Sequence, residues 1–427
     1  MMYIDVGKCV ALAGFVSSAL AYNTNDQVGA DVEYGTFQNP SVHVRPRFRY
    51  WIPDASVNLS VVASDFATVR SVGMGGLELL GYYLYGNFPH PVAEGGPTPV
   101  DWTKYGWGTE AWAELQNTAL QAIKDQGLIM DFALGPNQGA GVPAEEGNPG
   151  IMWDLWPFNA SVPIGGCFNG TLPGWNEVTG GQFVAATVGL VTRRVNETFT
   201  ASPAWLPAPP YNGADLTIVA ESLQDVTGQV DTTTGQINLS FPANASGLEY
   251  QIFAYYQNQT DYYEQAPPWY VNTTVTQSPI TSFVQNGSWV VDHYSSTGAQ
   301  VVIDFWENHL LDNKTRNLIH EVGNYGWEDS QEFGAGTLVW WTPQLLHAFR
   351  SARGYDLTKY LPLIYRYNTE QPGPLASPDH YYTDEDDQGQ SHINDYWQTV
   401  GSIFHEIPVS RDNANRRHSL RNSTKSI

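Results

Sequence analysis

Apolar residues recur at two different spacings over the first third of the chain. Residues 47–52 alternate as in a β-strand, whereas residues 60–72 carry apolar side chains at helical spacing. Residues 75–80 and the continuous apolar run 128–134 predict two further strands, and residues 110–125 predict a second helix. Short strand–helix units with buried strands indicate a parallel sheet, either closed as a barrel or open and doubly wound.

Strand patterns separated by turn residues interrupt this alternation from residue 163 to residue 284, which predicts a β-rich insertion. Helical spacing returns at residues 299–308 and 315–322, and again at residues 343–353. We therefore expect the α/β unit to comprise residues 22–162 and 285–404, on either side of the insertion.

The two ends of the chain differ from the rest. Residues 1–21 combine a short basic segment, an apolar stretch of about 13 residues and a small-residue end, which is typical of a cleaved secretory signal peptide. A membrane anchor is the alternative, but a spanning helix needs about 20 apolar residues. Residues 405–427 are basic and lack an apolar period, so we expect a disordered tail.

Composition narrows the range of partners. The 427 residues include 42% hydrophobic and 15% charged residues, as in a globular protein. The formal net charge of −23 disfavours nucleic acid and anionic membranes as partners and favours a neutral ligand, and no protein partner is implied. Once the signal peptide is removed, Cys167 is the single cysteine, which excludes an intramolecular disulfide and a Cys-rich zinc site.

Ten N-x-S/T sequons upstream of the last twenty residues indicate a glycosylated, secreted, extracellular protein. They begin at Asn58, Asn159, Asn169, Asn196, Asn238, Asn244, Asn258, Asn272, Asn286 and Asn313.

Most familiar catalytic motifs are missing from the sequence. There is no phosphate-binding loop, dinucleotide fingerprint, G-x-S-x-G elbow or H-E-x-x-H pair. The candidate chemistry that remains is that of carboxylate side chains beside aromatic ones. Aromatic residues make up 13% of the chain. An aromatic plane fits the C–H face of a sugar ring, and Trp107 and Trp327 follow predicted elements where such a platform would lie.

Candidate site residues occur at or just beyond the ends of predicted parallel strands, where α/β enzymes place their sites. They are Glu78, Asp131, Asn137, Gln138 and the acidic group from Glu328 to Glu332, which includes Asp329. Asp131 lies in an apolar strand, so it is either a hydrogen-bonded core acid or a site residue. Glycoside hydrolysis needs two such carboxyl groups on either side of one glycosidic bond.

Several ordered segments resemble glycoside hydrolase family 106, the α-L-rhamnosidases. The segments are residues 37–51, 73–76, 105–112 and 127–136, then Asp329-Ser330-Gln331-Glu332-Phe333, which is similar to the family's D-S-x-E segment, and residues 341–357. The resemblance covers about residues 35–145 and 285–400.

The resemblance implies a (β/α)8 TIM-barrel-type fold with the β-rich region inserted, hydrolysis of α-L-rhamnosides with inversion, and a calcium ion near the site. It also implies that Glu332 is one catalytic carboxylate, the base. Members are longer than this chain, so we expect an incomplete barrel that is poorly soluble and weakly active alone.

The leading hypothesis is a secreted α-L-rhamnosidase-like hydrolase that cleaves terminal rhamnose from plant-type polysaccharide or glycoside. The alternative is a non-catalytic carbohydrate-binding protein with an incomplete, inactive barrel. A lyase acting on uronic acid polysaccharide is a third possibility, but it would require basic residues beside the substrate carboxylate, and the candidate positions are acidic.

Overall fold

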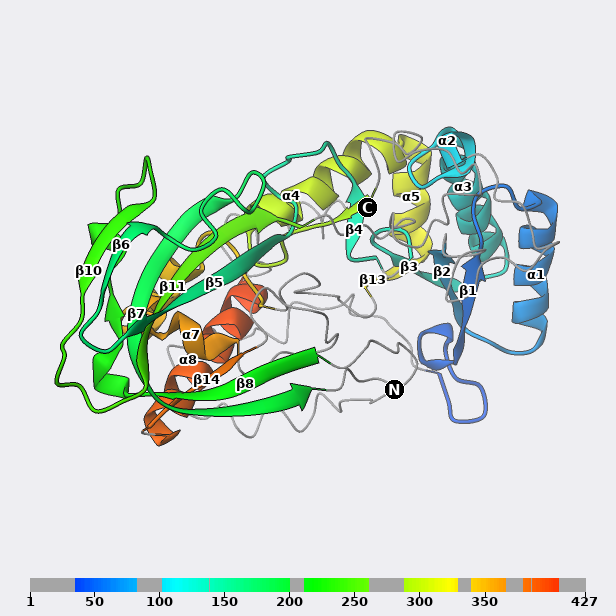
Figure 1. The fold of residues 1–427 in the computed structure, drawn as a ribbon. Helices are drawn as coiled ribbons and strands as arrows, with labels where there is room; N and C mark the ends of the chain where they lie inside the picture. The colour runs from blue at the N-terminus through cyan, green and yellow to red at the C-terminus, as the bar shows by residue number, and fades with distance from the viewer. Residues whose placement is uncertain are drawn as a thin grey trace.

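The computed structural model describes residues 35–82, 102–137, 139–199, 211–260, 288–328, 339–365, 379–384 and 386–406. These residues form a mixed α/β fold with two main sheets, one parallel and one largely antiparallel (Figure 1). The expected signal peptide and the expected basic tail from residue 407 onward lie outside the described residues.

The first sheet contains four parallel strands in the order β1-β2-β3-β13. The strands are β1 (Arg47–Ile52), β2 (Gly76–Gly81), β3 (Ile129–Ala133) and β13 (Gly323–Trp327). Helices α1 (Leu59–Ser71), α3 (Glu110–Asp125) and α5 (Asn313–Val322) lie together on one side of this sheet (Figure 1).

Successive side chains of each strand point to opposite faces of the sheet, so one face packs against the helices and the other does not. Leu77, Leu79 and Met130 point toward the helices and join a buried cluster with Phe66 and Leu120. The residues between them, such as Glu78 and Asp131, therefore face the opposite side of the sheet, which these helices do not cover.

The second sheet has six strands, and its main path runs in the order β14-β8-β7-β11-β5, with β9 paired to β7. The strands are β5 (Trp153–Pro163), β7 (Gln182–Phe199), β8 (Tyr211–Ile218), β9 (Gln224–Asp225), β11 (Glu249–Gln259) and β14 (His380–Thr383). The β-rich region thus begins ten residues earlier than expected, because β5 pairs with β11 from Trp153 to Pro163. A separate antiparallel pair joins β6 (Cys167–Thr171) to β10 (Gln236–Ser240).

A short strand pair connects the two sheets. It consists of β4 (Gly141–Pro143) and β12 (Ser288–Val290). Helix α4 (Ser296–Phe305) and the π-helical turn η8 (Trp306–Leu310) follow β12 and lead to α5. The short helical elements are η2 (Val42–Val44), α2 (Trp102–Tyr105), η3 (Ala220–Ser222), η4 (Thr227–Gln229) and η9 (Thr358–Tyr360).

The last described segments do not extend the parallel sheet. Helices α6 (Leu345–Arg353), α7 (Leu361–Ile364) and α8 (Asp386–Glu406) pack on the six-stranded sheet instead, and Phe349 and Tyr396 share a core there with Phe253. This differs from the expectation that residues 285–404 continue one barrel. Among the described strands the parallel sheet stays open, so the closed (β/α)8 barrel remains a prediction.

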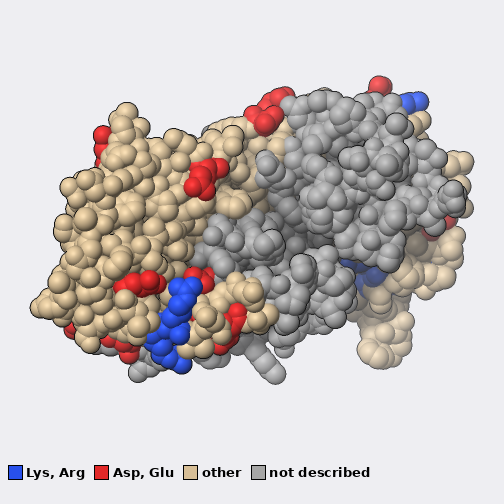
Figure 2. Space-filling model, in the orientation of Figure 1, with Lys and Arg blue, Asp and Glu red and all other residues tan. Residues whose placement is uncertain are grey.

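The described surface carries few basic groups. Figure 2 shows scattered Asp and Glu side chains and Lys and Arg side chains in a few separate places on the described part of this face. No described helix combines the length and apolar character that crossing a membrane requires.

Candidate functional site

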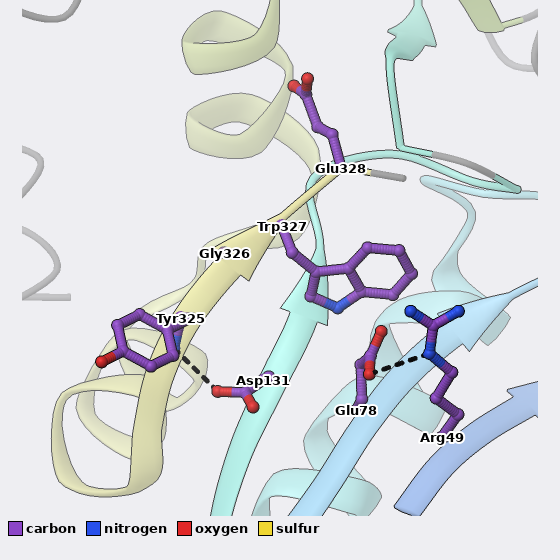
Figure 3. Close-up of a pocket in the computed structure, with 7 residues that line it drawn as sticks. All are labelled: Arg49, Glu78, Asp131, Tyr325, Gly326, Trp327 and Glu328. Carbon is purple, nitrogen blue, oxygen red and sulfur yellow. Dashed lines mark hydrogen bonds and ion pairs between the residues drawn. The ribbon is translucent and has the colours of Figure 1, made fainter. Parts of the chain in front are cut away.

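A cavity of about 410 Å³ opens on the helix-free face of the parallel sheet. Figure 3 shows the lining residues, which come from all four strands and from the residue that follows β13. They are Arg49, Glu78, Asp131, Tyr325, Gly326, Trp327 and Glu328.

Strand register places three charged residues in one row across the sheet. Arg49 pairs in register with Glu78, and Glu78 pairs with Asp131. Register partners on neighbouring strands lie about 4.8 Å apart and point to the same face. Glu78 and Asp131 therefore meet in the middle of their strands, rather than at the strand ends where the sequence pattern suggested.

Asp131 is nearly buried, at 8% exposure, and is fully engaged. Its Oδ2 accepts from Arg47 Nη1 at 2.7 Å, and its Oδ1 accepts from Asn324 Nδ2 at 2.8 Å and from the Tyr325 backbone N–H at 3.0 Å. Asp131 thus fixes β1 and β13 to β3. It is a hydrogen-bonded acid that lines the cavity, and its role as a site residue stays a prediction.

Arg49 and the indole of Trp327 form another part of the cavity wall, and Arg49 also contacts Trp51 outside the lining. The Arg49 Nε atom lies 3.4 Å from Glu78 Oε2. Its guanidinium lies 5.3 Å from the ring centre of Trp51 and 5.7 Å from that of Trp327, within the range of cation–π attraction. The wall therefore combines a cation, a carboxylate and aromatic planes (Figure 3).

Glu328 has a basic partner of its own. His293 Nε2 lies 2.9 Å from Glu328 Oε2, and His293 Nδ1 lies 2.7 Å from the Val291 carbonyl oxygen. Burial lowers the pKa of His293, but the charge and hydrogen bond of Glu328 together with the Val291 carbonyl outweigh burial, so the pKa is raised overall.

Two of the candidate residues lie away from this cavity. Trp107 is 3% exposed and packs in the core between the sheet and its helices, with its ring centre 4.3 Å from that of Trp112. Its large apolar surface explains this placement, so it offers no platform to a ligand. Asn137 is buried with a φ of 53°, and its backbone N–H donates to the Gly81 carbonyl at 2.7 Å, which fixes the turn after β3 to the end of β2.

Gln138, Asp329 and Glu332 lie outside the described residues. Of the candidates that the structure does describe, the cavity brings together Glu78, Asp131, Trp327 and Glu328. Sequence reasoning missed Arg47 and Arg49. Arg47 and Arg49 lie two positions apart in a predicted strand, and residues two apart in a strand point to the same face. This pattern could have indicated two arginines on one face of the sheet.

The described residues contain no group of three or more His, Cys, Asp or Glu side chains placed to hold a metal ion. Arginines already pair with Asp131 and Glu78. Calcium prefers six to eight oxygen ligands, so the described cavity does not fit this ion and we derive no chemical step through it.

No family model matches the chain, and no curated protein matches it. A solved structure of a rhamnosidase from Novosphingobium sp. PP1Y is similar with a TM-score of 0.48 and 11% identity, covering 91% of this chain. The chain spans 46% of that structure's length. Similarity at this level assigns neither a fold nor an activity, and family 106 membership stays a hypothesis.

Proposed function

We propose that this chain is an α-L-rhamnosidase-like glycoside hydrolase that cleaves terminal rhamnose from plant-type polysaccharide or glycoside. The observation that supports it is the lining of the cavity on the parallel sheet, where Glu78, Asp131 and Glu328 lie with Arg49 and the indole of Trp327. Carboxylates and guanidinium groups exchange hydrogen bonds with sugar hydroxyls, and an indole packs on the C–H face of the ring.

Glu78 and Asp131 are assigned to substrate binding. Each carboxylate is held in an ion pair with an arginine, Glu78 with Arg49 and Asp131 with Arg47, which suits a binding role better than proton transfer. Under this proposal Glu332 is one catalytic carboxylate, the base that activates water, as its place in the D-S-x-E segment implies. Trp327 and Asp329 would contact the sugar beside it.

The second candidate function is a non-catalytic carbohydrate-binding protein. The pairing of Glu78 with Arg49 and of Asp131 with Arg47 favours it, because carboxylates held in ion pairs bind hydroxyls well but exchange protons poorly.

The two candidates are separated by measuring hydrolysis and binding on the same preparation. We expect the full chain to hydrolyse an aryl α-L-rhamnoside, and Glu332→Gln to lower kcat by at least about 100-fold while retaining sugar binding in calorimetry. Glu321→Gln, at an exposed position on α5, is the matched control and should behave as wild type. Binding without hydrolysis by the wild-type chain would favour the binding protein, and unchanged turnover in Glu332→Gln would reject its role.

Secretion belongs to the same proposal. Of the eight sequon asparagines in described segments, six are exposed, namely Asn58, Asn169, Asn196, Asn238, Asn244 and Asn313, so oligosaccharyltransferase could reach them. A eukaryotic secreted preparation should lose mass on deglycosylation and begin near residue 22.

A further inference from the structure

His293 and Glu328 form a buried pair at the end of the cavity. His293 lies three residues after β12 and Glu328 directly follows β13, so the pair joins two segments that are distant in sequence. Their side chains are 9% and 13% exposed, and the Nε2–Oε2 distance is 2.9 Å. Trp327, the neighbour of Glu328, lines the same cavity (Figure 3).

The hydrogen bonds determine how many protons the pair holds. The Val291 carbonyl oxygen can only accept, so His293 Nδ1 carries a hydrogen. A neutral ring with its hydrogen on Nδ1 presents a lone pair at Nε2, which would repel the Glu328 carboxylate. Contact at 2.9 Å therefore requires one proton shared by His293 and Glu328.

We propose that this shared proton holds the cavity wall in place, with His293 as the positioning residue that ties Glu328, and with it Trp327, to the segment after β12. Ligand binding by the cavity then depends on the protonation of His293. The identity of the ligand as a carbohydrate rests on the proposed function, whereas the proton and its effect on the wall do not.

The backbone on the histidine side is firmly anchored. The Val291 N–H donates to Ala140 O at 3.2 Å, and the Asp292 N–H donates to Gly150 O at 2.8 Å. Repulsion after proton loss would therefore displace Glu328 rather than His293, because β13 ends at Trp327 and has a described partner strand only in β3.

The described charged groups that act on His293 are Glu328 and the adjacent Asp292. The Asp292 carboxylate accepts from Thr342 Oγ1 at 2.8 Å and from the Tyr294 N–H at 2.9 Å, and burial raises its pKa. Burial lowers the pKa of His293 while Glu328 raises it, so removing the Glu328 charge should reverse the sign of the shift.

The test is a nuclear magnetic resonance titration of the full chain without ligand, following the histidine ring nitrogens and the Trp327 indole N–H. The His293→Gln and Trp327→Phe variants assign the two signals. We expect His293 to titrate above the ordinary value of 6.5, the Trp327 signal to shift with the same midpoint, and Glu328→Gln to move the His293 midpoint below 6.5.

Sugar binding is then measured by calorimetry with L-rhamnose between about pH 5 and pH 9, a range that spans ordinary histidine titration. Wild-type affinity should fall at least about tenfold as pH rises through the His293 midpoint. The His293→Gln variant keeps a hydrogen-bond donor that does not titrate, so its affinity for L-rhamnose should depend little on pH. His392→Asn, in a separate cavity against α8, should keep the wild-type profile.

A His293 midpoint below 6.5 in the wild type, or a Trp327 signal that ignores the His293 titration, would overturn the proposal. If both signals titrate together but no sugar binds at any pH, the protonated pair is supported and the carbohydrate function is rejected. If sugar binds with the same pH dependence in His293→Gln as in wild type, the positioning role is wrong.

Discussion

Asp131 should contribute more to the stability of the parallel sheet than any exposed ion pair of the chain. Replacing it with Asn keeps the shape and an oxygen that can accept from Asn324 and from the Tyr325 N–H. The new NH₂ group, however, would face the Arg47 guanidinium, so a donor meets a donor and the ion pair is lost. Replacing Asp131 with Ala removes all three hydrogen bonds.

The magnitude follows from burial. Breaking a fully buried ion pair destabilises a protein by about 3–5 kcal/mol, because one charge is left without compensation. The side chains of Arg47 and Asp131 are 21% and 11% exposed, so water can solvate Arg47 in part. We therefore expect a loss of about 2 kcal/mol in the free energy of unfolding for Asp131→Asn and about 3 kcal/mol for Asp131→Ala.

The assay is equilibrium urea unfolding of the full chain, followed by tryptophan fluorescence, with a double-mutant cycle that combines Asp131→Asn and Arg47→Met. A coupling energy of about 1–2 kcal/mol is expected for the Arg47–Asp131 pair. Lys124→Met is the control, since Lys124 and Glu321 are 41% and 46% exposed, and it should change stability by less than about 1 kcal/mol. If Asp131→Asn lies within about 0.5 kcal/mol of wild type, the reasoning is refuted.

Two further predictions concern the same sheet and its helices. A Cβ on Gly76 would come within 2.0 Å of the Ile129 carbonyl oxygen, so Gly76→Ala should lower the free energy of unfolding by about 1–3 kcal/mol. Gly170 has open space where a Cβ would lie, so Gly170→Ala should be tolerated. Equal effects of the two variants in urea unfolding would contradict this. Asp312 caps α5 by accepting from the Thr315 N–H at 2.6 Å, and this bond lowers its pKa below 3.8. Asp312→Ala should lose about 1 kcal/mol at pH 7 and Asp312→Ser much less. Because the folded pKa of Asp312 is depressed, the advantage of Asp over Ser should begin to shrink as pH falls below 3.8 and should be lost as pH falls through the lower folded pKa. Thermal unfolding of both proteins across this range tests it, and a constant advantage would argue against it.

The elements that the sequence predicted well are those whose patterns are local. Helix α3 occupies Glu110–Asp125 as expected, because Thr109 caps its first turn and its apolar stripe faces the sheet. The strand β1 also matches the expected residues 47–52. In both cases the period of the pattern alone identifies the element.

The assignment of helices to sheets could not be predicted in the same way. The pattern at residues 343–353 indicates an amphipathic helix, and α6 does form there. An apolar helix face can cover either sheet, however. Phe349 of α6 belongs to the same buried cluster as Phe253 of the six-stranded sheet. The expected barrel continuation therefore differs from the described packing although the helix itself is correct.

Contacts within the cavity depend on register and on residues far apart in the chain. Alternation along β1 determines that Arg47 and Arg49 share a face, but not which carboxylates they meet. Pairing of Arg49 with Glu78 requires the β1–β2 register, and pairing of His293 with Glu328 joins residues separated by 35 positions. Such long-range contacts carry no local signal, which is why the cations of the site were missed while its acids were found.

These pairings also explain why an acidic chain can have an electrically balanced cavity. The formal charge is −23, yet each of the three cavity carboxylates has a basic partner: Glu78 has Arg49, Asp131 has Arg47 and Glu328 has His293. A balanced, polar and aromatic lining favours an uncharged ligand with many hydroxyls over an anion or a cation. Arginine keeps its charge at all physiological pH values, whereas histidine does not. Among the described pairs at the cavity, the charge balance therefore changes with pH at His293–Glu328, and loss of that proton would add negative charge to the cavity.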